Sequence, residues 1–176
     1  MKKGLVAMGL CALLILTGCA NAEQMAASAP VPHTAASVEG TVVTFDGTDY
    51  EITERCPSVN ALKIYDTIGE DTIIVGGHIN PKVVYYGVFD TKTKTFEKDI
   101  QGGNLTFYGD DVNTIVYSLW GDILNYNGEA LASYDLQEPE FISDLSYSED
   151  GTALNVTIRG ADGETERTES LVLSQK

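Results

Sequence analysis

Histidine and cysteine are scarce in this sequence: its 176 residues include two histidines and three cysteines. A closed zinc site takes four such ligands, and a nucleophilic serine or cysteine needs a base held beside it. The sequence has no Gly-x-Ser-x-Gly motif. His78 is the one candidate base, and Cys56 with His78 is the one candidate nucleophile–base pair. These shortages count against metal sites of nitrogen and sulfur ligands and against nucleophilic catalysis, so no catalytic residue is predicted.

Basic residues are also few. The chain has 11 Lys and Arg residues against 26 Asp and Glu residues, which gives a formal net charge of −15 at pH 7. A surface with this excess of negative charge repels phosphate backbones and anionic lipid headgroups. The charge therefore excludes nucleic acid as an expected partner, and a membrane would have to be reached by some means other than electrostatic attraction.

Long apolar runs are limited to the N-terminus, where residues 4–16 are uncharged and follow Lys2 and Lys3. This run is shorter than the roughly 20 residues that a membrane-spanning helix needs. A basic start followed by a short apolar core is typical of a signal peptide. The run ends in the sequence Leu16-Thr17-Gly18-Cys19.

Leu16-Thr17-Gly18-Cys19 resembles the lipobox of bacterial lipoproteins, in which an apolar residue and two small residues precede a cysteine that receives lipid. The resemblance implies that residues 1–18 are a signal peptide, that cleavage falls between Gly18 and Cys19, and that Cys19 carries the acyl chains. Each buried CH₂ contributes about 0.8 kcal/mol to membrane binding, so two or three chains hold a protein firmly. The implied location is the extracytoplasmic side of the cell membrane or outer membrane.

The mature chain that this resemblance implies is more acidic than the precursor. Removing Lys2 and Lys3 leaves 9 basic residues against 26 acidic residues, a net charge of −17. Residues 19–37 predict a lipidated flexible tether, because they have little apolar bulk and include Pro30, Pro32 and His33. Cys56 is then the one free thiol and has no internal disulfide partner; a buried thiol is favoured over an intermolecular disulfide.

Residues 38–176 predict an acidic all-β domain. Residues 41–45 and 50–53 flank Asp46-Gly47, a pattern typical of a β-hairpin. No segment has a sustained helical period of apolar residues. Further strands are predicted at 61–65, 72–76, 83–89, 95–100, 105–108, 114–119, 122–126, 130–134, 141–147, 153–158 and 169–173, separated by Gly, Asn, Asp or Pro.

An internal repeat connects these strands. Residues 105–117 match residues 144–156 at an offset of 39, and residues 71–75 match 113–117 at an offset of 42. Periods near 40 with four short strands indicate propeller blades. The acidic turn at 148–154 resembles the blade turns of Tol-type and WD-repeat propellers, a resemblance that covers roughly residues 60–173 without the Trp-Asp dipeptide. About three blade-like repeats are expected, as tandem four-stranded antiparallel meanders with propeller-like packing; a β-sandwich and an open meander are the alternatives.

Acidic pairs recur in the predicted turns, at Glu70-Asp71, Asp110-Asp111 and Glu149-Asp150. Oxygen-rich loops can hold calcium, so Asp110, Asp111, Glu149 and Asp150 are the calcium candidates. None of these turns has the alternating Asp-x-Asp-x-Asp-Gly spacing, and Asp and Gly favour turns for backbone reasons alone. Turn formation is therefore the favoured explanation, and no cofactor is predicted.

Trp120 is the candidate contact for a ligand. It is the one tryptophan of the chain and precedes Gly121-Asp122 at a predicted turn, where it would be partly exposed. An exposed aromatic side chain can stack on a sugar ring or anchor a protein partner. The alternative is that Trp120 fills the core between sheets, as most aromatic residues of alternating strands do.

These features predict an extracytoplasmic lipoprotein that acts as a non-enzymatic binding or scaffold module for a protein or glycan ligand. One alternative is a surface hydrolase or glycan-active enzyme that uses loop carboxylates. Another is a subunit of a cell-envelope complex, in which an unpaired sheet edge accepts a strand from a neighbour.

Overall fold

The computed structural model of this chain describes residues 36–160 and 166–173. Two units, Met1–Pro30 and Val31–Lys176, divide the chain, and all described residues belong to the second. The predicted signal peptide, the lipid-bearing Cys19 and His33 lie outside the described residues. In the described part, no helix is long and apolar enough to cross a bilayer.

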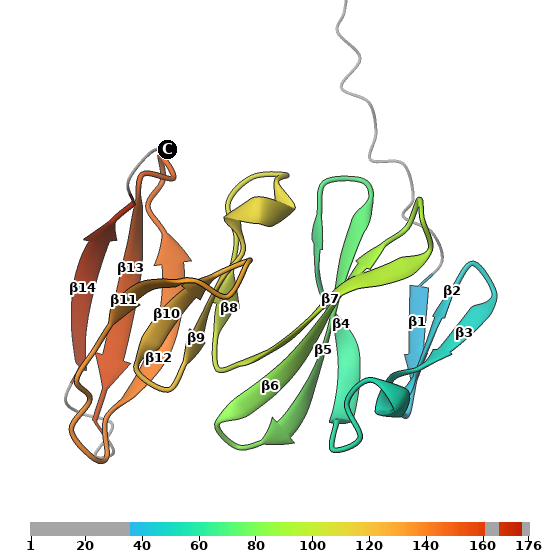
Figure 1. Cartoon of the computed structure of the whole chain (residues 1–176), viewed down its shortest axis with the longest axis horizontal. Helices are drawn as coiled ribbons and strands as arrows, with labels where there is room; N and C mark the ends of the chain where they lie inside the picture. Colours follow the sequence, from blue (N-terminus) through green and yellow to red (C-terminus); the bar gives the residue numbers. More distant parts are fainter. Residues whose placement is uncertain (1–35, 161–165, 174–176) are drawn as a thin grey trace, which may run out of the picture. The chain divides into compact units, whose positions relative to one another are not determined.

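The described residues form four antiparallel sheets, each built from strands that follow one another in the sequence (Figure 1). Two sheets have three strands and two have four, and no α-helix occurs in residues 36–160 and 166–173. The all-β prediction is confirmed. Sheet A contains β1 (Ala36–Glu39), β2 (Val42–Phe45) and β3 (Thr48–Glu51); sheet B contains β4 (Asn60–Ile68), β5 (Thr72–Asn80), β6 (Val83–Asp90) and β7 (Thr95–Gly102); sheet C contains β8 (Leu105–Thr106), β9 (Val116–Leu119), β10 (Asp122–Asn125) and β11 (Ala130–Ser133); sheet D contains β12 (Phe141–Tyr147), β13 (Ala153–Arg159) and β14 (Glu166–Val172).

The strand boundaries follow local sequence signals. The Asp46-Gly47 turn joins β2 to β3 with φ angles of 49° and 76°, as predicted for a hairpin of this composition. The structure departs from the prediction in several places. Sheets A and D have three strands instead of the expected four, β8 ends at Thr106, and β14 begins at Glu166. Strand β1 begins at Ala36, inside the segment assigned to the tether, and two short 3₁₀ helices, η1 (Ile52–Glu54) and η2 (Val112–Thr114), replace predicted strand ends.

Three apolar clusters lie between successive sheets. The A–B cluster contains Val43, Phe45, Ile52, Cys56, Val59, Ile73, Val75, Tyr85 and Phe89. The B–C cluster contains Ile68, Ile74, Tyr86, Val88, Ile100, Leu105, Ile115 and Tyr117. The C–D cluster contains Val116, Ile123, Ile142, Leu145, Leu154, Val156 and Ile158. Each cluster draws on two sheets, so the core of the domain consists of three apolar layers rather than one.

Sheets B and C are apolar on both faces, because side chains alternate along a strand. In β5, Ile73 and Val75 belong to the A–B cluster, while Ile74 between them belongs to the B–C cluster. Near-continuous apolar runs such as residues 73–75 are therefore expected in a strand that is packed on both sides.

Sheets A and D are apolar on one face only. On the other face of sheet D, cross-strand rows of polar residues run Asp144–Thr157–Thr168 and Ser146–Asn155–Ser170. The corresponding row of sheet A is Ser37–Thr44–Asp49. These rows lie opposite the apolar clusters, so the outer faces of sheets A and D are mainly polar, although Phe141 and Val172 are exposed on sheet D.

Candidate functional site

Trp120 lies at the tip of the hairpin between β9 and β10. Leu119 pairs with Asp122, so Trp120 and Gly121 alone make the turn. Its side chain is 69% exposed, more than any other aromatic side chain in the described part of the chain. The prediction that Trp120 is exposed in a turn is confirmed, and its role as a ligand contact stays a prediction.

The backbone of Trp120 is strained. Its φ of 55° lies in the left-handed region, which costs a residue other than glycine about 1–2 kcal/mol. The neighbouring Gly121 does not have a positive φ. It has a different constraint, because an added Cβ on Gly121 would lie 2.4 Å from the carbonyl oxygen of Tyr134. The Tyr134 amide donates a 2.8 Å hydrogen bond to the carbonyl of Gly121. Glycine at position 121 therefore allows Tyr134, just after β11, to approach the turn closely. The left-handed position of the turn is occupied by Trp120.

The polar groups at this tip are mostly engaged. Asp122 Oδ1 accepts a 2.6 Å hydrogen bond from the Ser133 hydroxyl, and the carbonyl of Gly121 is bonded to Tyr134. Asp135, one residue beyond Tyr134, is exposed. The tip thus presents one large aromatic ring with the exposed carboxylates of Asp122 and Asp135 beside it.

The three acidic turns are structurally equivalent and adjacent. Each joins the first strand of a sheet to the second: β4 to β5, β8 to β9 and β12 to β13. An added Cβ on Gly69 would lie 3.4 Å from Asp110, and the Tyr108 hydroxyl donates to the carbonyl of Glu149 at 3.3 Å. The Tyr108 and Tyr147 rings, which the repeat aligns with each other, lie 5.6 Å apart.

Two calcium candidates form hydrogen bonds within their own turns. Asp111 Oδ1 accepts from the Asn113 amide at 2.9 Å. Hydrogen bonds from the Ser148 hydroxyl and from Thr152 lower the pKa of Asp150 to about 2. Across the described residues, no three His, Cys, Asp or Glu side chains are placed to hold a metal ion. These contacts support turn formation for Asp111 and Asp150, and calcium binding at Asp110, Asp111, Glu149 and Asp150 stays a prediction.

The candidate pair Cys56 and His78 occupies two different environments. Cys56 is 3% exposed within the A–B cluster, which confirms the prediction of a buried thiol. His78 is exposed on β5, where it pairs with Asn60 of β4. No hydrogen bond joins the two side chains within residues 36–160, so the structure does not bring them together as a catalytic pair.

A cluster of polar contacts joins the end of η1 to sheet B and was not predicted; its members are Arg55, Tyr85 and Asp99, and we call it the polar lock. The buried Tyr85 hydroxyl donates to Asp99 at 2.6 Å, and Arg55 binds the same carboxylate through Nε and Nη2 at 2.9 and 2.8 Å. The Arg55 guanidinium also lies 4.9 Å from the centre of the Phe96 ring. Burial, followed by the bond to Asp99, raises the pKa of Tyr85. The lock borders a shallow depression lined by Asp49, Tyr50, Glu51, Glu54, Arg55 and Phe96.

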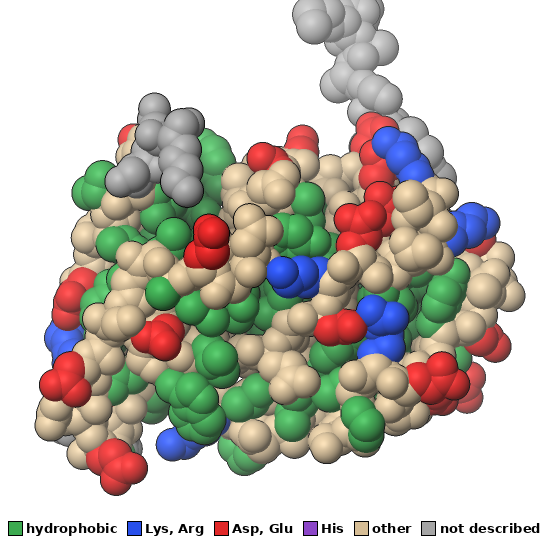
Figure 2. Space-filling view, in the orientation of Figure 1, with side chains coloured by type: hydrophobic (Ala, Val, Ile, Leu, Met, Phe, Trp, Pro, Cys, Tyr) green, Lys and Arg blue, Asp and Glu red, His purple; other side chains and the backbone are tan. Residues whose placement is uncertain are grey.

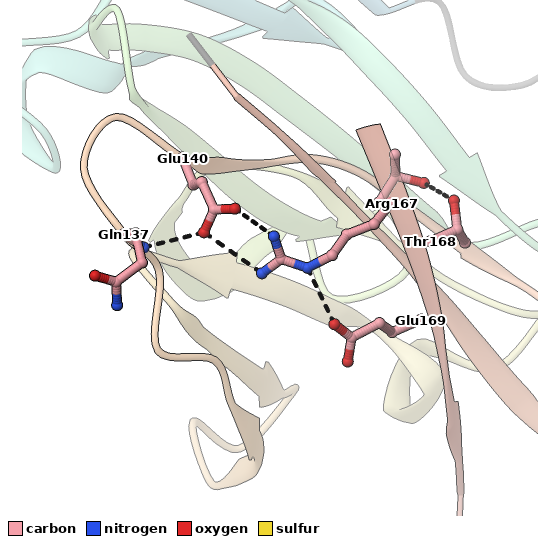
Figure 3. Close-up of polar contacts among 6 residues, drawn as sticks. Gln137, Glu140, Arg167, Thr168 and Glu169 are labelled. Atoms are coloured by element: carbon pink, nitrogen blue, oxygen red, sulfur yellow. Dashed lines mark hydrogen bonds and ion pairs between the residues drawn. The ribbon is translucent and has the colours of Figure 1, made fainter. Parts of the chain in front are cut away.

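A second ion-pair network secures β14 to the loop before β12 (Figure 3). Glu140 accepts from the Arg167 guanidinium and from the Gln137 amide, and Arg167 Nε donates to Glu169 at 3.2 Å. These bonds lower the pKa of Glu140 and raise the pKa of Arg167. The network serves to hold an edge strand in place, because each partner is satisfied within it.

Charged side chains are scattered over the face seen in Figure 2. Figure 2 shows acidic side chains spread over the visible face, with basic side chains few and separated. No family model, no curated protein and no solved structure matches this chain.

Proposed function

We propose that this protein is a lipid-anchored, extracytoplasmic lipoprotein whose β-sheet domain binds a ligand through Trp120. The anchor is supported by Leu16-Thr17-Gly18-Cys19 and by the basic and apolar residues before it. The first strand begins at Ala36, which leaves 17 residues from Cys19 to the start of the domain. A segment of that length allows the domain to work at a distance from the membrane surface.

We also propose that the four sheets are propeller-like blades arranged in an open series. Three observations support this arrangement. Each sheet is a meander of consecutive strands, successive sheets share an apolar cluster, and the acidic turns occupy equivalent places in sheets B, C and D. The polar outer faces of sheets A and D supply a reason for the series to end there without closing.

Trp120 carries the binding proposal. Asn, Asp or Gly would adopt a φ of 55° at lower cost, and the exposed tryptophan side chain belongs to none of the three apolar clusters. An exposed tryptophan that strains the backbone without contributing to the core supports a role in contact with another molecule. The domain is proposed to bind without catalysis, because the contact is a single aromatic ring.

The anchor is tested by the Cys19→Ala variant. We expect this variant to remain an unprocessed precursor or to appear without acyl chains, because the thiol that receives the lipid is absent. Mass spectrometry of the purified chain and fractionation of cells measure both outcomes. A Cys19→Ala protein that still carries acyl chains and still sediments with membranes would refute the anchor.

The binding role is tested by labelling a thiol beside the tip. In an Asp135→Cys variant the new thiol is exposed, Cys56 is buried, and Cys19 is proposed to be acylated, so a maleimide should react at position 135. We expect slower labelling in envelope preparations of the source cell than in the purified full chain. Adding Trp120→Ser should restore the fast rate, whereas adding Phe141→Ser, which removes an aromatic ring that is 43% exposed on sheet D, should not. Equal rates in envelope and purified protein would overturn the binding role.

A further inference from the structure

The shape of the Trp120 tip restricts what can bind it. A two-residue turn ends the hairpin as a protrusion, and the ring stands 69% exposed on it. A protruding ring buries more of its surface in a concavity of the other molecule than on a flat one. Aromatic anchors that fill a partner's pocket are a common centre of protein–protein interfaces.

The charge beside the ring argues against a membrane surface. Asp122 is exposed next to the tip, and the whole chain carries a formal net charge of −15. Carboxylates are repelled by anionic headgroups and attracted by basic side chains. The partner that fits both the ring and the charge is a protein with an apolar pocket and a basic rim.

We propose that Trp120 is the anchor of a protein–protein interface, inserted into an apolar pocket that is bordered by Lys or Arg residues of a different protein. This inference rests on the proposed binding role of Trp120 and names the class of its partner. The ring and the carboxylates should affect different rates. The ring governs affinity through the dissociation rate, and the carboxylates govern the association rate and its salt dependence.

The experiment attaches a photoactivatable benzophenone to the new thiol of the full-chain Asp135→Cys variant in envelope preparations and irradiates it. We expect one protease-sensitive adduct whose yield falls at least tenfold with Trp120→Ser, is unchanged with Phe141→Ser, and falls as salt is raised. The protein in the adduct is then identified, purified and titrated into the wild-type chain. Trp120 is the one tryptophan of the chain, so its emission can be followed in a difference spectrum. The emission should shift to shorter wavelength on binding, because the ring leaves water.

Three results would overturn this inference. One is protection of the thiol at position 135 in the envelope without a Trp120-dependent protein adduct. Another is a purified adduct protein that leaves the emission of Trp120 unchanged. The third is a blue shift of Trp120 emission caused by chitohexaose or by phosphatidylcholine vesicles at low millimolar concentration. The first and third results would leave the proposed binding role standing with a glycan or a lipid as ligand, and the second would show that the protein partner does not bury the Trp120 ring. An unprotected thiol at position 135 would remove the binding role itself.

Discussion

At the scale of single residues, the backbone of Trp120 and its side chain oppose each other. The side chain is exposed, so it gains little from folding, while the φ of 55° costs free energy. A different residue at position 120 would therefore make the folded protein more stable. Stability and binding are expected to change in opposite directions when this residue is replaced.

The Trp120→Asn variant should be more stable than the wild type by about 1 kcal/mol, because asparagine tolerates the left-handed region. Urea unfolding followed by far-ultraviolet circular dichroism measures this difference without relying on tryptophan fluorescence. Leu131→Asn is the matched control, since Leu131 is an exposed apolar residue within a strand. A Trp120→Asn protein that is less stable than the wild type would show that the ring does support the fold.

Acid titration should show the hydrogen bonds of Asp150. Its pKa is lowered from an ordinary value of 3.8 to about 2. A carboxyl group with a lowered pKa in the folded state contributes stability above its unfolded value, and that contribution is lost as the pH falls toward the folded value. Stabilisation by this turn is therefore complete above about pH 4 and disappears between pH 4 and pH 2.

Carbon-detected NMR of the Asp150 carboxyl group measures the titration directly. We expect a midpoint near pH 2 in the wild type and a midpoint closer to 3.8 in Ser148→Ala, because Ser148 donates the strongest of the hydrogen bonds. An identical midpoint in the two proteins would contradict the assigned cause.

At the scale of strands and turns, the β9–β10 hairpin depends on close contact with the end of β11. Gly121→Ala should destabilise the domain by about 2 kcal/mol, since its Cβ would lie 2.4 Å from the Tyr134 carbonyl oxygen and force the strands apart. Gly40→Ala is the control, because Gly40 has a φ of 62° but open space around it and should cost about 1 kcal/mol. Chemical denaturation measures both, and a smaller loss for Gly121→Ala would contradict the contact.

Short-range features of the fold could be predicted from the sequence, whereas contacts between sheets could not. The Asp46-Gly47 hairpin is local, and its sequence specifies the two positive φ angles. Arg55 and Asp99 are 44 residues apart, and no periodicity connects them. Strand β1 was missed because Ala36 and Ser37 have weak strand preference and are held in place by pairing with β2.

The Trp120 turn shows the same division within one site. Gly121-Asp122 predicts a turn, and the structure contains one. The usual expectation that glycine takes the left-handed position fails here, because Gly121 is needed for the approach of Tyr134. That requirement comes from β11, a strand whose position relative to the turn cannot be read from the residues of the turn.

At the scale of the whole domain, sheets B and C should be the most protected part of the chain. They are packed on both faces, whereas sheets A and D are packed on one. Hydrogen exchange measured by mass spectrometry should therefore be slower for β5 and β6 than for β2 and β13, the central strands of the outer sheets. Equal exchange in all four would indicate that the domain opens as a single unit.

The polar rows on sheets A and D bear on self-association. A sheet that is apolar on both faces can bury either face against a further sheet, whereas a polar outer face gains little from such a contact. These two outer faces therefore oppose stacking of one copy of the domain on another. Replacing Thr157 and Asn155 with valine would make the outer face of sheet D more apolar, and two copies of the chain would then associate through that face.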